Sequence, residues 1–225
     1  MILLLALFLG PILWFLYRAI VVLKETSNRR RTSLKDRPLR QDGDGPIKTL
    51  AVLGSGGHTT EMLQLLKTVD SKAYSPLIFV VAESDTTSER RVEAFEGGRK
   101  PDQTFRIPRS REVGQSYISS IGTTLYAFFF CMKLVWDVKP DLLLCNGPGT
   151  CLPIAIATLF YRILGVCEGN LVFIESFCRV ESLSLTGKLL YPLADLFIVH
   201  WDELHQKFPK SCTISTFVPN KSKES

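Results

Sequence analysis

A glycine-rich turn is the first place where this sequence could do chemistry. Gly54-Ser55-Gly56-Gly57-His58 follows the apolar run 49–53 and precedes a segment with helical periodicity, 59–69. Glycines let the backbone come close to a ligand, and the free N–H groups of a helix start favour phosphate. The residues expected to bind phosphate here are Gly54, Ser55, Gly56, Gly57 and Thr59. The turn is not a complete dinucleotide fingerprint, since Thr59 stands where the third glycine would be.

His58 lies directly at the start of the expected helix. An imidazole can accept a proton from a reacting hydroxyl or donate to a phosphate oxygen near neutral pH. It can equally well cap local backbone groups. The residue types alone leave these alternatives open.

Two further loops carry groups suited to a diphosphate. Arg109 and Arg111 lie in the basic loop 107–113, and Asn146, Gly147 and Gly149 form a second glycine turn after the apolar run 141–145. Guanidinium groups bind phosphate with paired hydrogen bonds. A solvated loop with an Arg111–Glu112 neighbour pair is the alternative for the first of these loops.

Carboxylates follow two other apolar runs. Glu175 follows the run 171–174 and is a weak candidate for a base or a hydroxyl ligand. Glu83 and Asp85 end the run 77–82, where a ribose-binding carboxylate of a nicotinamide-dependent enzyme would lie. A self-sufficient nucleotide-dependent enzyme is therefore one alternative function.

The elements that must position these loops alternate along the chain. Apolar runs without internal alternation predict buried strands, and segments of helical periodicity separate them. The expected strands are 49–53, 77–82, 104–107, 141–145, 171–174 and 195–200, and the expected helices are 59–69, 86–95, 117–138, 150–164 and 185–190. This order predicts an α/β domain with a Rossmann-like parallel sheet, whose ligands bind beyond the carboxyl ends of the strands.

Two apolar helices invite comparison with a membrane span. The uninterrupted apolar stretches 125–132 and 151–161 are too short to cross a bilayer. We expect both helices to be buried, with a face resting on a partner or a bilayer as the alternative.

The first 23 residues predict a membrane anchor. About 22 apolar or neutral residues, interrupted only by Arg18, match the roughly 20 that a bilayer helix needs. Neither a basic leader nor a small-residue cleavage site is present, so we expect an uncleaved helix. Nine basic residues between positions 18 and 48 face four acidic ones, which places the N-terminus across the membrane and the domain in the cytosol.

Composition sets the limits on the rest of the chain. Hydrophobic residues make up 46% and charged residues 22%, which suits a globular core. The net charge of +5 is concentrated beside the anchor, which argues against a nucleic-acid partner. The six cysteines form no metal motif, so we expect reduced thiols, no metal and no cofactor. The expected segments are the anchor 1–23, a basic linker 24–46, the domain 47–211 and a polar tail 212–225.

Four motifs together resemble one glycosyltransferase family. They are the glycine turn 54–61, the basic loop 107–113, the turn 145–151 and the segment 175–184. The first is similar to the Gly-Gly-His turn of GT-B enzymes that act on lipid-linked sugars. With the anchor, the set resembles the membrane-anchoring subunit of the bipartite UDP-N-acetylglucosamine transferase of the dolichol pathway.

The resemblance implies a division of labour. This chain would be the N-terminal GT-B half, inactive alone, which binds the dolichol-linked acceptor and recruits a soluble subunit that holds UDP-N-acetylglucosamine. The complex would add the second N-acetylglucosamine to GlcNAc-diphosphodolichol at the cytosolic face of the endoplasmic reticulum. His58 would be the base or would orient the acceptor, and Arg109 and Arg111 would hold its diphosphate.

One departure affects the expected partner. The family tends to end in a short apolar tail, whereas this chain ends in the polar run Asn220 to Ser225. That ending puts the docking of the soluble subunit in doubt. Independently of the tail, a third possible function is a pure membrane scaffold that recruits the partner and whose own pocket is vestigial.

Overall fold

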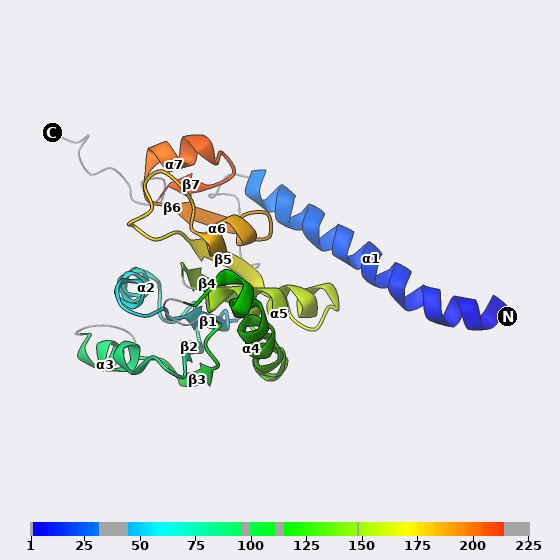
Figure 1. Ribbon diagram of the computed structural model, residues 1–225, viewed down its shortest axis with the longest axis horizontal. Coiled ribbons are helices and arrows are strands. Elements are labelled where there is room, and N and C mark those ends of the chain that lie inside the picture. Colours follow the sequence, from blue (N-terminus) through cyan, green and yellow to red (C-terminus); the bar gives the residue numbers. More distant parts are fainter. Residues whose placement is uncertain (1, 32–44, 96–99, 111–114, 148, 214–225) are drawn as a thin grey trace.

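The fold is built on one parallel sheet. The computed structural model describes residues 2–31, 45–95, 100–110, 115–147 and 149–213 (Figure 1). Within these ranges the sheet has seven strands in the order β3-β2-β1-β4-β5-β6-β7, all paired in parallel. They are β1 (Thr49–Val52), β2 (Leu77–Ala82), β3 (Gln103–Ile107), β4 (Leu142–Asn146), β5 (Asn170–Ile174), β6 (Leu196–Val199) and β7 (Cys212–Thr213). The predicted Rossmann-like parallel sheet is confirmed.

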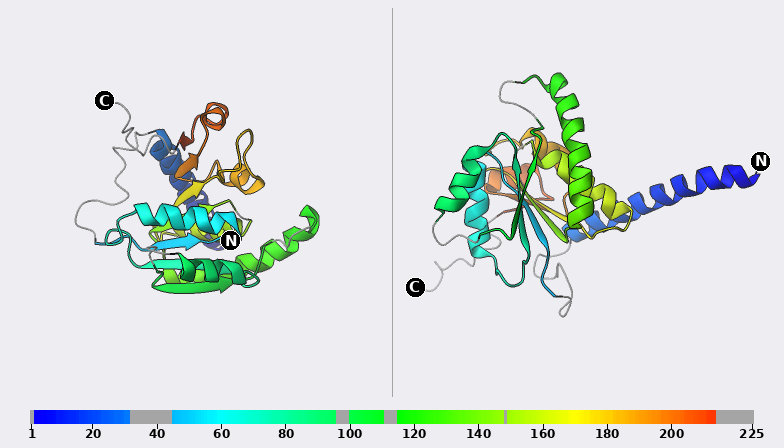
Figure 2. Two further views of the ribbon diagram at one scale, coloured as in Figure 1. Left: turned by 90° about the vertical axis from the view of Figure 1, so that its left-hand side faces the viewer. Right: turned by 90° about the horizontal axis from the view of Figure 1, so that it is seen from below.

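Helices cover both faces of the sheet, which is why its central strands are apolar along their whole length. On one face lie α2 (Gly57–Thr68) and α3 (Thr86–Ala94), and on the other lie α4 (Tyr117–Val138) and α5 (Cys151–Ile163) (Figure 2). Met62, Leu63 and Leu66 of α2 pack into the first core. Val135 of α4 and Ile154 of α5 pack into the second. Every residue of β1, β2, β4 and β5 is buried.

The strand order reverses direction between β1 and β4, which are neighbours in the sheet although two strands intervene in sequence. At such a point the loops that follow the two strands diverge to opposite faces and leave a crevice at the carboxyl edge. The first glycine turn follows β1 and the second follows β4. The topology therefore brings the two predicted turns together.

The end of the domain differs from the expected boundary. Two short helices, α6 (Leu185–Leu190) and α7 (Asp202–Lys207), flank β6, and α7 leads into β7 at Cys212 and Thr213. The polar tail expected from residue 212 therefore begins with an edge strand, because backbone pairing with Ile198 and Val199 needs no apolar run. Residues 214–225 lie outside the described part of the chain.

The N-terminal helix continues beyond the expected anchor. Helix α1 (Ile2–Arg31) runs eight residues past position 23, and its C-terminal turns pack against the domain (Figure 1). Thr26 is buried and donates to the Asp195 carboxylate at 3.0 Å, and Asp195 also accepts from Arg162 at 2.7 Å. Residues 24–31 are thus a docked helix and not part of a linker, while residues 32–44 lie outside the described ranges.

Two more contacts hold α1 in place. The Arg18 guanidinium donates to the carbonyl of Ile163 at 3.2 Å, at the C-terminal end of α5. The ring of Phe15 lies 5.9 Å from that of Phe160. A cavity of about 550 Å³, lined by charged side chains of both signs, lies at this junction of α1 with the domain.

Helix α4 is more exposed than we expected. Its inner face is buried on α5, but Ile118, Ile121, Leu125, Tyr126 and Phe129 are largely exposed. By length and composition, the stretch Ile118–Val138 could cross a membrane, and most of it is exposed in the structure. The uninterrupted run 125–132 looked too short because Lys133 ends it. In the structure Lys133 pairs with Asp137, one turn further along the helix, at 2.8 Å.

Candidate functional site

The buried side chain of Thr59 stabilises the first glycine turn. Gly56 adopts φ +70° directly before α2, a backbone conformation that favours glycine. The Thr59 side chain is buried and bonds to the Gly54 carbonyl and to Ser88 Oγ. Its hydroxyl therefore stabilises the turn from inside, so that of Thr59 only the backbone N–H is left to meet a ligand. Ser55 lies on the exposed side of the turn.

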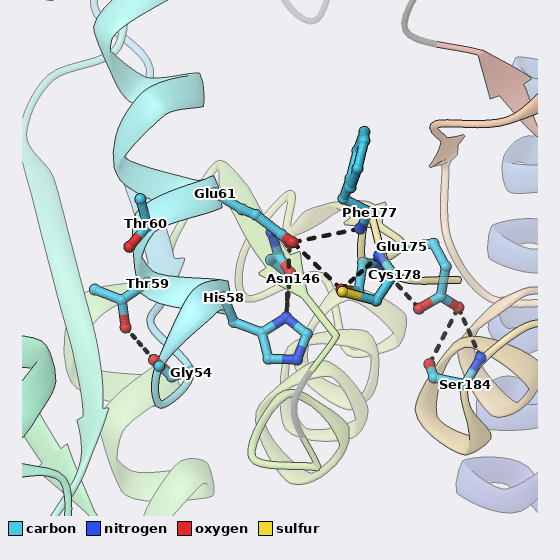
Figure 3. Close-up of polar contacts among 12 residues, drawn as sticks. Gly54, His58, Thr59, Thr60, Glu61, Asn146, Glu175, Phe177, Cys178 and Ser184 are labelled. Atoms are coloured by element: carbon cyan, nitrogen blue, oxygen red, sulfur yellow. Dashed lines mark hydrogen bonds and ion pairs between the residues drawn. The ribbon is translucent and has the colours of Figure 1, made fainter. Parts of the chain in front are cut away.

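His58 is in direct contact with the second glycine turn. Its Nδ1 lies 2.9 Å from Oδ1 of Asn146, the last residue of β4 (Figure 3). Gly147, at φ +67°, lies directly beside the ring, where a β-carbon would be 2.4 Å from His58 Cε1. The structure thus joins three predicted site residues, His58, Asn146 and Gly147.

Glu61 is a site residue that the sequence analysis did not identify. Its Oε2 accepts from Asn146 Nδ2 at 3.0 Å, and its Oε1 accepts from Ser176 Oγ and from the Phe177 N–H, each at 3.3 Å (Figure 3). The available signal was the spacing of His58 and Glu61, which puts both side chains on one face of α2. The carboxylate links the loops that follow β1, β4 and β5.

Arg109 lies above the first turn, after β3. Its guanidinium reaches Ser84 Oγ at 3.3 Å and Ser55 Oγ at 3.5 Å, both long contacts. These side chains come from the loops after β2 and β1, so Arg109 adds positive charge beside the glycine turn. Arg111 lies outside the described residues, and Gly149 is exposed at the start of the turn that leads into α5.

Glu175 is placed differently from a base open to substrate. Its side chain is fully buried, and its oxygens accept from the backbone N–H groups of Ser176 and Ser184 and from Ser184 Oγ. A β-carbon on Gly187 would lie 2.3 Å from Glu175 Oε2. The carboxylate holds the segment 176–184 against α6, and this structural use leaves it little capacity for proton transfer.

His200 is a second residue that the sequence analysis did not place in the site. It follows β6, and its ring lies 5.5 Å from that of Phe177. Its Nε2 is buried and has no hydrogen-bond partner within the described ranges. Burial lowers the pKa of His200 below its usual value, and the Glu61 carboxylate, a hydrogen bond with the Glu175 backbone and the Glu175 carboxylate offset this only in part.

The carboxylates after β2 do not form a ribose site. Glu83 is exposed, and Asp85 accepts from the Ser88 N–H at 3.0 Å as the N-cap of α3. Burial raises the pKa of Asp85, but the hydrogen bonds from Ser88 and Thr87 outweigh this and leave it lower than usual. The geometry favours a capping role for Asp85 over the nicotinamide alternative.

The fold resembles one half of the GT-B fold. Among solved structures, MurG of Acinetobacter baumannii matches with a TM-score of 0.53 and 16% identity, over 70% of this chain and 43% of that one. A putative UDP-N-acetylglucosamine 2-epimerase of Listeria monocytogenes matches with a TM-score of 0.54 and 15% identity, over 73% and 42% of the respective chains. This chain therefore spans less than half the length of these structural neighbours.

The particular family follows from the sequence comparisons. The chain belongs to the family described as oligosaccharide biosynthesis protein Alg14 like, whose model matches residues 49–217. It is 48% identical to the UDP-N-acetylglucosamine transferase subunit ALG14 of Rattus norvegicus, over 75% of this chain and 82% of that protein. The subunit of the same name from Homo sapiens is 46% identical over 76% and 83% of the two chains, and that of Candida albicans 40% identical over 89% of each. Membership of this family supports a subunit role in oligosaccharide biosynthesis.

Proposed function

We propose that this chain is the anchoring, acceptor-binding subunit of a UDP-N-acetylglucosamine transferase. With a soluble donor-binding subunit, it would add the second N-acetylglucosamine to GlcNAc-diphosphodolichol at the cytosolic face of the endoplasmic reticulum. The relatives named above are transferase subunits, and the chain's own residues are compatible with the acceptor side of that reaction. Alone, the chain is inactive.

One observation carries the proposal. The described chain contains one parallel sheet, and it spans only 43% of the MurG chain that it resembles. Transfer between two substrates in a GT-B arrangement needs a second Rossmann-like half facing the carboxyl edge of this sheet. A separate partner chain supplies that half in our proposal.

The partner would cover an apolar surface beside the crevice. Phe177, Val180, Leu185 and Leu189 are each more than 40% exposed and lie on the segment after β5 and on α6. Exposed apolar side chains grouped next to a site are typical of docking surfaces. We expect Leu189→Arg to reduce recovery of the partner in a pull-down, whereas Glu93→Arg on α3, across the sheet, leaves it unchanged.

The chemistry proposed is a direct displacement with inversion. The acceptor 4-hydroxyl forms a bond to the anomeric carbon of the donor sugar while the bond to UDP breaks, and UDP leaves with the electron pair. His58 takes the hydroxyl proton through Nε2, because its Nδ1 is occupied by Asn146. Arg109 and the backbone N–H groups of the first glycine turn hold the acceptor diphosphate.

The membrane arrangement follows from two apolar helices. In our proposal α1 spans the membrane with its N-terminus in the lumen, as the basic residues after it favour. Its exposed apolar side chains include Leu13, Trp14, Tyr17 and Ile20. Helix α4 packs with α5 in one core through Cys131 and Val135, and in our proposal its exposed outer face rests on the bilayer surface.

A reconstituted transfer assay tests the proposal. The full chain in membranes is mixed with UDP-N-acetylglucosamine and a diphosphate-linked lipid acceptor, with and without the candidate soluble partner. We expect product only with both chains, and a loss of about 10²-fold or more for His58→Ala. His205→Ala, on α7, is the matched control. Product from this chain alone contradicts the split-enzyme proposal, and full activity of His58→Ala contradicts the base assignment.

A further inference from the structure

A continuous line of hydrogen bonds runs from the backbone of Phe177 to the ring of His58. Phe177 N–H donates to Glu61 Oε1, Asn146 Nδ2 donates to Glu61 Oε2, and Asn146 Oδ1 faces His58 Nδ1 (Figure 3). The two residues of each hydrogen bond lie 85 to 116 residues apart in sequence, whereas His58 and Glu61 lie on one turn of α2. Three loops of the carboxyl edge are thus tied together at one carboxylate.

The direction of each hydrogen bond is fixed from the Phe177 end. A backbone N–H can only donate, so Glu61 Oε1 must accept. An ionised carboxylate has no proton to give, so the Asn146 atom that faces Oε2 must be the amide nitrogen. The other amide atom, Oδ1, then faces His58 and can only accept. Glu61 therefore decides the orientation of an amide whose two ends would otherwise be interchangeable.

The same logic fixes the proton on His58. Since Asn146 Oδ1 accepts, His58 Nδ1 must carry the hydrogen, and in the neutral ring the lone pair is then on Nε2. Glu61 Oε2 lies 3.7 Å from His58 Nδ1, beyond hydrogen-bond length, while Asn146 Oδ1 lies at 2.9 Å. The neutral amide thus stands between the ring and the carboxylate, an arrangement that suits a histidine that accepts a proton.

We propose that Glu61 and Asn146 are positioning residues that hold His58 in the Nδ1–H tautomer. Neither residue touches substrate, and both act through the imidazole of His58. Gly147 has no side chain, which leaves room for that ring. The tautomer follows from the contacts alone, and its use for proton acceptance at Nε2 rests on the proposed function. The loop after β5 takes part in this positioning, because Ser176 and Phe177 donate hydrogen bonds to the Glu61 carboxylate, which orients Asn146.

The tautomer is measured directly by nitrogen NMR on the full chain in detergent or nanodiscs. The sequence has three histidines, His58, His200 and His205, so a His58→Gln spectrum assigns the resonances. At a pH well above the usual histidine pKa of about 6.5, the unprotonated ring nitrogen resonates far downfield. We expect this nitrogen of His58 to couple strongly to both ring carbon protons, as Nε2 does. A downfield Nδ1 in the wild-type chain overturns the proposal.

Glu61→Gln reverses the direction of the line while keeping its shape. The glutamine oxygen must still accept from the Phe177 N–H, so its NH2 group faces Asn146, which turns its own NH2 group toward His58 Nδ1. We expect His58 in this variant to shift toward the Nε2–H tautomer. Glu89→Gln is the matched control: Glu89 lies on α3 and pairs with Arg106 at 2.6 Å, away from the crevice. Asn146→Leu gives a second route if Glu61→Gln unfolds, which thermal unfolding reports. A single, unchanged tautomer in a folded Glu61→Gln or Asn146→Leu chain overturns the proposal.

Kinetics of the assembled complex separate this role from a structural one. We expect Glu61→Gln to lower kcat about tenfold or more while KM changes less than about threefold, since a base in the wrong tautomer fails only in the transition state. Glu89→Gln should keep wild-type kcat. An equal loss in both variants, or a change confined to KM, contradicts the positioning role. If the wild-type complex shows the expected tautomer but no transfer, the proposed function fails and the positioning of His58 stands.

Discussion

Gly147 and His58 are in contact in a way that no other amino acid at position 147 would permit. A β-carbon at this position would lie 2.4 Å from His58 Cε1 and 2.8 Å from Nδ1, and the backbone there has φ +67°. We predict that Gly147→Ala displaces the imidazole and lowers the transfer activity of the complex about a hundredfold. The steric cost of positive φ should lower the free energy of unfolding by a further 1–2 kcal/mol or so.

Gly169 provides the control for that experiment. It also has positive φ, at +53°, and a β-carbon there would lie 2.5 Å from Thr158 Cγ2, on the side of the sheet away from the crevice. Gly169→Ala should therefore lose comparable stability but keep its activity per folded molecule. Thermal unfolding and the transfer assay, run on both variants, give the comparison. Equal activity losses would mean that the effect of Gly147→Ala is only a folding defect.

Ser184 should matter for stability and not for chemistry. It caps α6 by accepting from the Gly187 N–H at 2.9 Å, and its hydroxyl donates to Glu175 at 3.1 Å. We predict that Ser184→Ala lowers the free energy of unfolding by about 1 kcal/mol, with kcat retained. Denaturant unfolding and steady-state kinetics measure the two quantities. A large loss of kcat in a stable variant would instead return Glu175 to the catalytic candidates.

Asp195 should be the most sensitive residue at the junction with α1. It pairs with Arg162, and both side chains are almost fully buried. We predict that Asp195→Ala costs about 3–5 kcal/mol, because it leaves a buried guanidinium unpaired. Thr26→Val removes one hydrogen bond and should cost about 1 kcal/mol.

The pairing of these two charges is tested by a double variant. Arg162→Met with Asp195→Leu removes both charges and should be less destabilising than Asp195→Ala alone. Thermal unfolding of the full chain in detergent ranks the variants. Asp195 also accepts from the Leu171 N–H at 2.9 Å. A double variant that is at least as unstable as Asp195→Ala would show that this hydrogen bond and the one from Thr26, and not the ion pair, dominate.

His200 should make the fold sensitive to mild acid. Burial lowers its pKa in the folded chain, so the unfolded chain binds the proton first as the pH falls. The contribution of neutral His200 to stability is therefore present above a pH of about 6.5 and is lost as the pH falls below that value. We predict a decline in the free energy of unfolding over this range that is smaller in His200→Asn. Parallel pH profiles for both chains would contradict it.

The sequence predicted the long central helices and strands well and the short elements near the end of the domain poorly. Helix α4 and strand β2 have the predicted bounds, since long apolar segments closed by Pro140 or by polar loops leave few alternatives. Helix α7 and strand β7 were missed because Leu204 is the buried residue of α7 and β7 has two residues. Apolar composition also misled us about α4, whose outer face is exposed.

The sequence predicted several residues of the candidate site but not the hydrogen bonds that connect them. The parallel-sheet rule was enough to expect His58, Asn146 and Gly147 at one edge. Glu61 looked like a residue of a helix start, because its partners Asn146 and Ser176 are 85 and 115 residues away in sequence. Contacts of that kind depend on the packing of loops, which local patterns do not encode.

If α1 spans the membrane as we propose, its docking on Asp195 makes the position of the site depend on membrane thickness. The segment proposed to span the bilayer and the segment fixed to the domain belong to one helix of about 45 Å. A span changes its tilt with the thickness of the bilayer. Because the end of the helix is fastened to the sheet, that tilt is passed on to the whole domain. The angle and height at which the carboxyl edge meets a lipid-borne substrate would then change with the thickness of the membrane. A domain attached by a flexible linker would not show this dependence.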